Sequence, residues 1–345
     1  MGQQSSAFVV EIANPRLGRF QAVPQKDPDD EEKRCEWRIT VNPAEELVES
    51  TSLRGLLTRL YEQQTLVTQP DCKQLLTALH IVDSSSELLL PLLTVISNCT
   101  ARVGNQVLFR ENSIVKRVYQ LLPSSAHWPR PCRIMLLQCL ANMCGDFNNL
   151  PILQGSTALL VKKVSSSDET EATIAMQALT NLSRNIQPSQ VNDYVPAIGP
   201  CLDRLWIRGE TNLNALRLLV NLACCPQIVP MILGSKSVMG LFRLLDCDKD
   251  EVLLRVLTWL LCLSSAVHAL SITYDVIAPH NMDPFHNPSH TLFYSIYGPQ
   301  GRTEMESRVE ELRNSSNLEI STKSERLLET LKKIPRWPST TLNQL

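Results

Sequence analysis

Three histidines near the end of the chain come closest, by type and spacing, to a chemical site. His280, His286 and His290 follow an H-x5-H-x3-H pattern in a stretch rich in proline and asparagine, with two aspartates close by. Three imidazoles and a carboxylate are a ligand set that zinc accepts. Two prolines bracket the last pair and oppose a helix there, and the HExxH pattern is absent. We therefore expect a surface loop, with a metal-dependent enzyme built on it as the remote alternative.

The rest of the chain carries none of the common catalytic patterns. It has no GxSxG nucleophile elbow, no GxxxxGK[ST] phosphate loop and no GxGxxG turn. We therefore expect no catalytic residues, no cofactor and no small-molecule substrate.

The amino terminus carries a lipidation pattern. Once Met1 is removed, Gly2 begins the sequence Gly-Gln-Gln-Ser-Ser, which fits the M-G-x-x-x-[ST] pattern for N-myristoylation. A single myristoyl chain binds membranes weakly and reversibly, and no cysteine precedes Cys35 to take a second acyl chain. The pattern predicts a reversible membrane tether at Gly2, and an unmodified, unstructured start is the alternative.

Asparagines recur at a nearly constant interval through the middle of the chain. They follow apolar runs, as in Leu179-Thr-Asn-Leu-Ser183 and Val220-Asn-Leu-Ala223. The steps between equivalent positions are 44, 39, 40 and 41 residues, and these positions are Asn98, Asn142, Asn181, Asn221 and the aligned Cys262. A period near 40 residues with a long apolar helix in each unit is typical of armadillo or HEAT repeats.

The elements that carry these asparagines have helical patterns. Ile174, Ala178 and Leu182 share one face at i, i+4 and i+8. Prolines stand before the helix expected near Cys132 and after the one expected to end near Cys225. Such units bury apolar faces against their neighbours. The predicted fold class is all-α: an armadillo-like right-handed superhelix (α-solenoid) of about six repeats with a flexible N-terminal arm.

Composition and charge narrow the class of protein. The 345 residues include 33 Lys plus Arg against 35 Asp plus Glu, a formal charge of −2, so we expect no nucleic-acid partner. The eleven cysteines form no CxxC pair and are expected to be reduced core thiols in the cytosol or nucleus. The best candidate for a membrane span, residues 252–267, contains Arg255, so we expect none.

Three parts are expected along the chain. Residues 1–44 contain four prolines and an acidic run, and they predict a flexible arm. The helical repeat domain is expected over 45–335, and a flexible tail over 336–345.

Longer segments resemble one armadillo family in particular. The chain is similar to the armadillo-like domain of the X-linked armadillo repeat-containing proteins and their autosomal relatives, over roughly residues 75 to 335. The collinear segments are Ala178–Asn185, Leu216–Ala223, Glu251–Thr258, Thr291–Gly298 and a closing helix around Ser324–Ile334. The resemblance implies a non-enzymatic scaffold or adaptor linked to mitochondrial distribution or trafficking. Typical members carry a hydrophobic N-terminal anchor, whereas this chain offers Gly2.

The repeat asparagines are the predicted partner-binding residues. In armadillo arrays this amide points into a concave groove and bonds the backbone of an extended peptide. The alternative is that the amides only satisfy backbone groups between repeats. The predicted groove residues are Asn98, Asn142, Asn181, Asn221, Arg217, Arg255 and Trp259.

Alternatives also remain open for the other groove candidates. Arg217 and Arg255 could pair with acidic ligand groups or form salt bridges between repeats. Trp206 and Trp259 are candidate platforms, although an aromatic residue on a helix more often belongs to the core.

The sequence as a whole predicts a scaffold that binds a peptide or a folded protein partner. We expect a cytoplasmic location with membrane association through the myristoyl group, at the mitochondrial outer surface or another cytosolic membrane face. A diffusible cytosolic or nuclear regulatory adaptor without lipid is the alternative.

Overall fold

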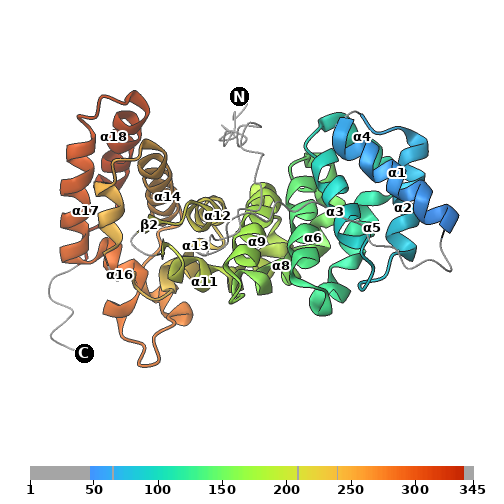
Figure 1. The fold of residues 1–345 in the computed structure, drawn as a ribbon. Coiled ribbons are helices and arrows are strands. Elements are labelled where there is room, and N and C mark those ends of the chain that lie inside the picture. The colour runs from blue at the N-terminus through green and yellow to red at the C-terminus, as the bar shows by residue number, and fades with distance from the viewer. Residues whose placement is uncertain (1–46, 64–65, 208–209, 239, 338–345) are drawn as a thin grey trace, which may run out of the picture. The chain divides into compact units, whose positions relative to one another are not determined.

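The computed structural model describes residues 47–63, 66–207, 210–238 and 240–337. The predicted N-terminal arm, including Gly2, and nearly all of the predicted tail lie outside these residues. Within them the chain is mostly helical (Figure 1). The longer α-helices are α1 (Leu47–Gln63), α2 (Gln69–Ile81), α3 (Leu89–Cys99), α4 (Val103–Glu111), α5 (Ile114–Leu121), α6 (Arg130–Met143), α8 (Thr157–Val164), α9 (Glu169–Leu182), α12 (Leu213–Ala223), α14 (Asp250–Ala269), α17 (Pro299–Leu312) and α18 (Leu318–Lys332).

Shorter helical segments connect them. The short α-helices are α7 (Leu150–Leu153), α10 (Val191–Tyr194), α11 (Ile198–Asp203), α13 (Val229–Gly234), α15 (Tyr274–Ile277) and α16 (Leu292–Tyr297). The 3-10 helices used below are η7 (Leu241–Asp246), η8 (Ala278–His280) and η9 (Pro288–His290).

The chain divides into two compact units, with the boundary after Ile114. In the first unit α1 packs on α2 and α3, and α2 packs on α3 and α4. Leu75, Leu92 and Ile96 are fully buried there. Three packed amphipathic helices are the building block of an armadillo repeat.

The second unit is organised around a row of helices. In chain order α6 packs on α9, α9 on α12, α12 on α14 and α14 on α18, and we call these five helices the row (Figure 1). A second layer covers one side of it, because α8 packs on α9, α11 on α12, α13 on α14 and α17 on α18. The row helices α9, α12 and α14 carry the recurring positions Asn181, Asn221 and Cys262.

Capping side chains determine where several row helices begin, and the spacing of apolar residues determines which face they bury. Asp168, Asn212 and Asn317 cap α9, α12 and α18, and each side chain accepts hydrogen bonds from main-chain N–H groups of the first turn. Ile174 and Ala178 lie on the buried face of α9, as the apolar spacing predicts. The prediction of an all-helical repeat fold is thus confirmed.

A small hairpin interrupts the helical pattern between α11 and α12. Strands β1 (Trp206–Ile207) and β2 (Glu210–Thr211) pair antiparallel, with Trp206 opposite Thr211. The main-chain N–H of Asn212 donates to the Leu205 carbonyl oxygen at 2.9 Å, which closes the hairpin directly before α12. These two strands were not predicted from the sequence.

Two buried asparagines close the ends of successive helices. The Asn105 amide nitrogen donates to the Cys99 carbonyl oxygen at 3.0 Å, at the end of α3. The Asn149 amide nitrogen donates to the Met143 carbonyl oxygen at 3.0 Å, at the end of α6. Both bonds span six residues, so equivalent positions of two repeats satisfy equivalent helix-end carbonyls.

Helix α14 is the one helix among the described residues that is long and apolar enough to cross a membrane, by length and composition alone. It packs on α12 and α18, and Leu257, Trp259 and Leu263 on it are buried. Packing in the core of the second unit accounts for its apolar character.

Candidate functional site

The half-exposed polar positions of α6, α9, α12 and α14 are the candidate site. Several of the polar positions that these helices leave half-exposed recur at helical spacing. Most of them are uncharged amides and hydroxyls, which can donate to or accept from a polypeptide backbone. We call this set the row face, and it consists of Gln138, Asn142, Thr173, Gln177, Asn181, Arg217, Arg255 and Thr258.

The recurring asparagines bond the preceding helix of the row. The Asn181 amide nitrogen donates to the Ala141 carbonyl oxygen at 3.3 Å. The Asn221 amide nitrogen donates to the Thr180 carbonyl oxygen at 2.7 Å and to the Ser183 hydroxyl at 3.2 Å. Both contacts join one repeat to the next. They fit the alternative that these amides satisfy backbone groups between repeats. Binding of a partner by these asparagines stays a prediction.

The other two asparagines lie in different surroundings. Asn142 is half-exposed, and its amide oxygen accepts from the Gln138 amide at 2.9 Å. Asn98 is exposed near the end of α3, in the first compact unit. Both side chains are accessible to solvent.

Two further contacts join neighbouring repeats, one near the carboxyl end of α6 and one near the carboxyl end of α12. The Arg184 guanidinium donates to the Cys144 carbonyl oxygen at 2.7 Å and to the Gly145 carbonyl oxygen at 3.0 Å, beyond the end of α6. At the next interface along, the Cys262 sulfur lies 3.6 Å from the Cys224 sulfur. A pair of thiols thus lies between α12 and α14, and Cys262 holds the recurring asparagine position.

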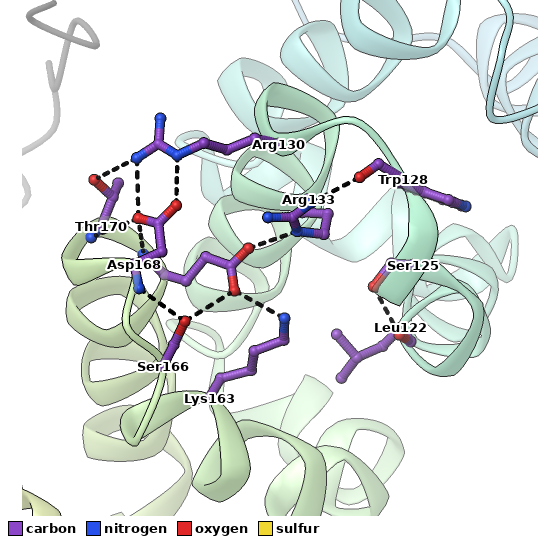
Figure 2. A network of polar contacts seen from close by, with 10 residues as sticks. Leu122, Ser125, Trp128, Arg130, Arg133, Lys163, Ser166, Asp168 and Thr170 are labelled. Carbon is purple, nitrogen blue, oxygen red and sulfur yellow. Dashed lines mark hydrogen bonds and ion pairs between the residues drawn. The ribbon is translucent and has the colours of Figure 1, made fainter.

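Ion pairs cross the row at the amino ends of α6 and α9 (Figure 2). Arg130 makes a two-point contact with the Asp168 carboxylate and donates to the Thr170 hydroxyl at 3.3 Å. Arg133 and Lys163 both reach the Glu171 carboxylate, at 2.7 and 2.8 Å. Acidic residues at helix amino ends are favoured by the helix dipole.

The environment of Glu171 keeps its carboxylate ionised. Only 3% of the side chain is exposed, and burial by itself would raise the pKa. The hydrogen bonds from Lys163 and Arg133 outweigh burial and lower the pKa of Glu171 below its ordinary value. This buried charge is therefore paired on two sides, as a stable repeat interface requires.

The two arginines of the row face differ in their partners. Arg217 on α12 forms an ion pair with Glu251 at the start of α14, so it links two repeats. Arg255, one turn beyond Glu251 on α14, is half-exposed and makes no ion pair with a described residue. Arg255 is therefore the cation of the row face that remains available to a ligand.

The prediction that Trp259 lines a groove is wrong. Trp259 is fully buried in the second unit, because it lies on the side of α14 that packs against the neighbouring helices. Its indole N–H has no hydrogen-bond partner. Trp206 is half-exposed on β1 and lies outside the row helices.

The histidine stretch folds into a surface loop through Asp283. Its carboxylate accepts from the main-chain N–H of Phe285 and Asn287 and lies 2.9 Å from the His290 ring nitrogen. These bonds and the pairing with His290 lower the pKa of Asp283. His280 lies on η8 and His286 has a positive φ of 50°. The described part of the chain brings no three His, Cys, Asp or Glu side chains together as metal ligands.

The ion pairs that join the repeats were not predicted from the sequence. Arg130 and Asp168, and likewise Arg133 and Glu171, are 38 residues apart, which is close to one repeat. A search for opposite charges separated by one repeat would have found them. The thiol pair Cys224 and Cys262 has the same separation of 38 residues.

The comparisons with known proteins agree with this fold. Residues 149–278, which contain α9, α12 and α14, match the family model described as Armadillo-like. No curated protein sequence matches the chain. The closer resemblance to the X-linked armadillo repeat-containing proteins stays a prediction.

Several solved structures share the fold at low sequence identity. The designed armadillo repeat protein YIII(Dq)4CqI has a TM-score of 0.55 at 16% identity, over 75% of this chain and 98% of its own. Two engineered proteins of the Northeast Structural Genomics Consortium have TM-scores of 0.53 and 0.55, each at 17% identity. They cover 77% and 83% of this chain, and 98% and 69% of their own. The chain therefore has an armadillo-like fold.

Proposed function

We propose that this armadillo-like protein is a non-enzymatic scaffold that binds an extended segment of a partner protein across the row face. The observation that carries the proposal is the composition of that face. Gln138, Asn142, Thr173 and Gln177 provide half-exposed amides and hydroxyls on adjacent helices.

Amide and hydroxyl side chains are suited to binding the main chain of a partner segment, whatever the amino-acid sequence of that segment. An extended segment repeats its N–H and C=O groups at short, regular intervals along its length. Amide side chains carry a donor and an acceptor together, so they can bond such a backbone whatever its side chains are. Gln177 would supply these bonds, while the amide nitrogens of Asn181 and Asn221 bond the neighbouring repeat.

Charge supplies the expected preference among partners. Arg255 has no carboxylate partner among the described residues, whereas Arg217 is paired with Glu251. A guanidinium binds carboxylates with two parallel hydrogen bonds. The preferred segment would therefore place an acidic side chain beside Arg255.

A peptide selection tests this proposal. Extended peptides would be selected from a phage-displayed random library on the full chain, and their affinity measured by fluorescence anisotropy. Arg255→Glu and Gln177→Ala are expected to weaken binding, the charge reversal by ~tenfold or more, which corresponds to about 1.4 kcal/mol. Lys162→Ala, an exposed change on α8 in the other layer, is the matched control. Unchanged binding by Arg255→Glu would contradict the assignment of the row face.

We further propose that Gly2 carries a myristoyl group that tethers the protein reversibly to a cytosolic membrane face, the mitochondrial outer surface being one candidate. The support is the amino-terminal sequence Met-Gly-Gln-Gln-Ser-Ser. The alternative is a diffusible cytosolic or nuclear adaptor that uses the same face without lipid.

Intact mass and membrane fractionation separate these two possibilities. The wild type expressed in a eukaryotic cell should carry the mass of one myristoyl group, and Gly2→Ala should lose both that mass and membrane association. An unmodified wild-type protein would remove the lipid from the proposal and leave the peptide-binding function to stand alone.

A further inference from the structure

The thiols of Cys224 and Cys262 form a pair at the surface of the second unit. Cys224 directly follows α12 and is exposed, while Cys262 lies on α14 and is half-exposed. Their sulfur atoms are 3.6 Å apart. A disulfide has a sulfur–sulfur distance of about 2.05 Å, so the pair must close by about 1.5 Å. Side-chain rotation with a small shift of the end of α12 is a movement on that scale.

The surroundings of this pair differ from those of most other described cysteines. Either thiol can donate a hydrogen bond to the other, and donation from Cys262 lowers the pKa of the Cys224 thiol. By contrast, Cys144 and Cys201 are buried, and burial raises the pKa of each to about 12. Cys225, next in the chain, also has a raised pKa because of burial. Thiolates react with oxidants and thiols scarcely do, so reactivity should concentrate at Cys224.

We propose that Cys224 and Cys262 form an oxidation site that a hydroperoxide converts into a disulfide between α12 and α14. The thiolate sulfur of Cys224 attacks the outer oxygen of the hydroperoxide. The O–O bond breaks, a sulfenic acid forms on Cys224, and the leaving oxygen departs as an alcohol, or as water when the oxidant is hydrogen peroxide. The Cys262 sulfur then attacks the Cys224 sulfur, the S–O bond breaks, and the hydroxyl group leaves as water with the proton of the Cys262 thiol.

The electrons and atoms of this sequence balance. Two thiols lose two electrons and two protons in total, and one peroxide bond gains them. A low-molecular-weight thiol reductant reverses the reaction by thiol–disulfide exchange. The oxidised state would link neighbouring helices of the row covalently, at the interface where Cys262 replaces the recurring asparagine. This site stands on the geometry of the thiols and does not depend on the proposed peptide binding.

Mass spectrometry of the full chain tests the site. The protein would be treated with hydrogen peroxide, alkylated with N-ethylmaleimide in denaturant and digested without reductant. We expect a linked peptide pair containing Cys224 and Cys262, formed ~tenfold faster than any modification of Cys225. Cys225→Ser is the matched control and should form the same link at the same rate. A Cys225–Cys262 link, or oxidation of Cys225 before Cys224, would overturn the assignment.

Substitution of either member identifies the order of the two steps. Cys262→Ser should trap the sulfenic acid on Cys224, where dimedone labels it, while Cys224→Ser should leave Cys262 unreacted. Dimedone labelling of Cys262 in the Cys224→Ser protein would contradict the role of Cys224 as the attacking thiol.

A probe on the unaltered protein guards against substitutions that fail to fold. Phenylarsine oxide bridges two thiols that lie close together. One molecule bound to the reduced wild type should protect Cys224 and Cys262, and no other pair, from alkylation. Failure to protect this pair would show that the two sulfurs do not approach each other in solution, and the proposal would be rejected.

Discussion

The Asn221 amide nitrogen lies 2.7 Å from the Thr180 carbonyl oxygen, so the side chain of one repeat satisfies the main chain of the repeat before it. Asn221 is only 7% exposed. The bond therefore belongs to the interior of the interface between α9 and α12.

This contact makes Asn221 a stability residue. Asn221→Ala leaves the Thr180 carbonyl and the Ser183 hydroxyl without this donor, and should lower the free energy of unfolding by about 1–3 kcal/mol. Gln177→Ala on the row face should change it by less than about 0.5 kcal/mol. Urea unfolding monitored by circular dichroism measures both. An Asn221→Ala protein as stable as the wild type, but defective in peptide binding, would instead support direct contact of Asn221 with the partner.

Glu171 should make stability fall in acid. Its pKa in the folded state lies below the ordinary value of 4.5, so the ionised carboxylate stabilises the fold above that pH. The contribution is lost as the pH falls through the folded-state pKa. Glu171→Gln should lower the free energy of unfolding by about 1–3 kcal/mol at neutral pH, and the difference from wild type should shrink in acid.

A matched glutamate provides the control for this pH dependence. Glu169 lies two residues earlier on α9, with 53% of its side chain exposed and 3.7 Å from Arg204. Glu169→Gln should leave the acid dependence of the unfolding free energy nearly unchanged. An equal effect of the two substitutions would mean that the pairing of Glu171 with Arg133 and Lys163 does not stabilise the fold.

The contribution of Trp259 to stability should come from the volume of its side chain more than from its indole N–H. Trp259→Ala leaves a large cavity in the core and should cost about 3–5 kcal/mol. Trp259→Phe keeps most of the ring volume and removes an N–H that has no partner, so its cost should be clearly smaller. Thermal or urea unfolding of both variants measures this difference. A Phe variant as unstable as the Ala variant would mean that the indole N–H is bonded in solution.

Gly234 should tolerate no side chain, because the histidine loop lies against it. A Cβ atom at this position would come within 2.5 Å of the His280 carbonyl oxygen, and the Gly234 carbonyl oxygen accepts from the Met282 N–H at 3.1 Å. Gly234→Ala should therefore displace the loop and lower the melting temperature. Hydrogen exchange at Met282 reports on the loop directly. Gly199→Ala, where a Cβ meets nothing within 4 Å, is the control and should leave that exchange rate unchanged.

The sequence predicted the repeats because their spacing follows from packing. An interval near 40 residues and the apolar face of Ile174, Ala178 and Leu182 both arise from stacking of similar helices, and the structure has them as predicted. The helix starts were also readable, since Asp168 and Asn212 are residues of the kind that cap helices.

The orientation of individual side chains, toward the core or toward solvent, was harder to predict. Trp259 and Arg255 stand one turn apart on α14, yet one is fully buried and the other half-exposed. Which side of a long apolar helix is covered depends on neighbouring helices from elsewhere in the chain. The ion pair of Arg217 was also hard to predict, because its partner Glu251 is 34 residues away along the chain. Spacing within one helix carries no information about such pairs.

Contacts between neighbouring repeats dominate the row, and this has a consequence for the kinetics of folding. The bonds that join α6 to α9, α9 to α12 and α12 to α14 connect residues 34 to 41 positions apart. Closing each interface therefore costs a similar and modest loop entropy. No interface among these depends on bringing distant parts of the chain together first. Folding of α6, α9, α12 and α14 can therefore nucleate at any adjacent pair of these helices and spread outward in both directions.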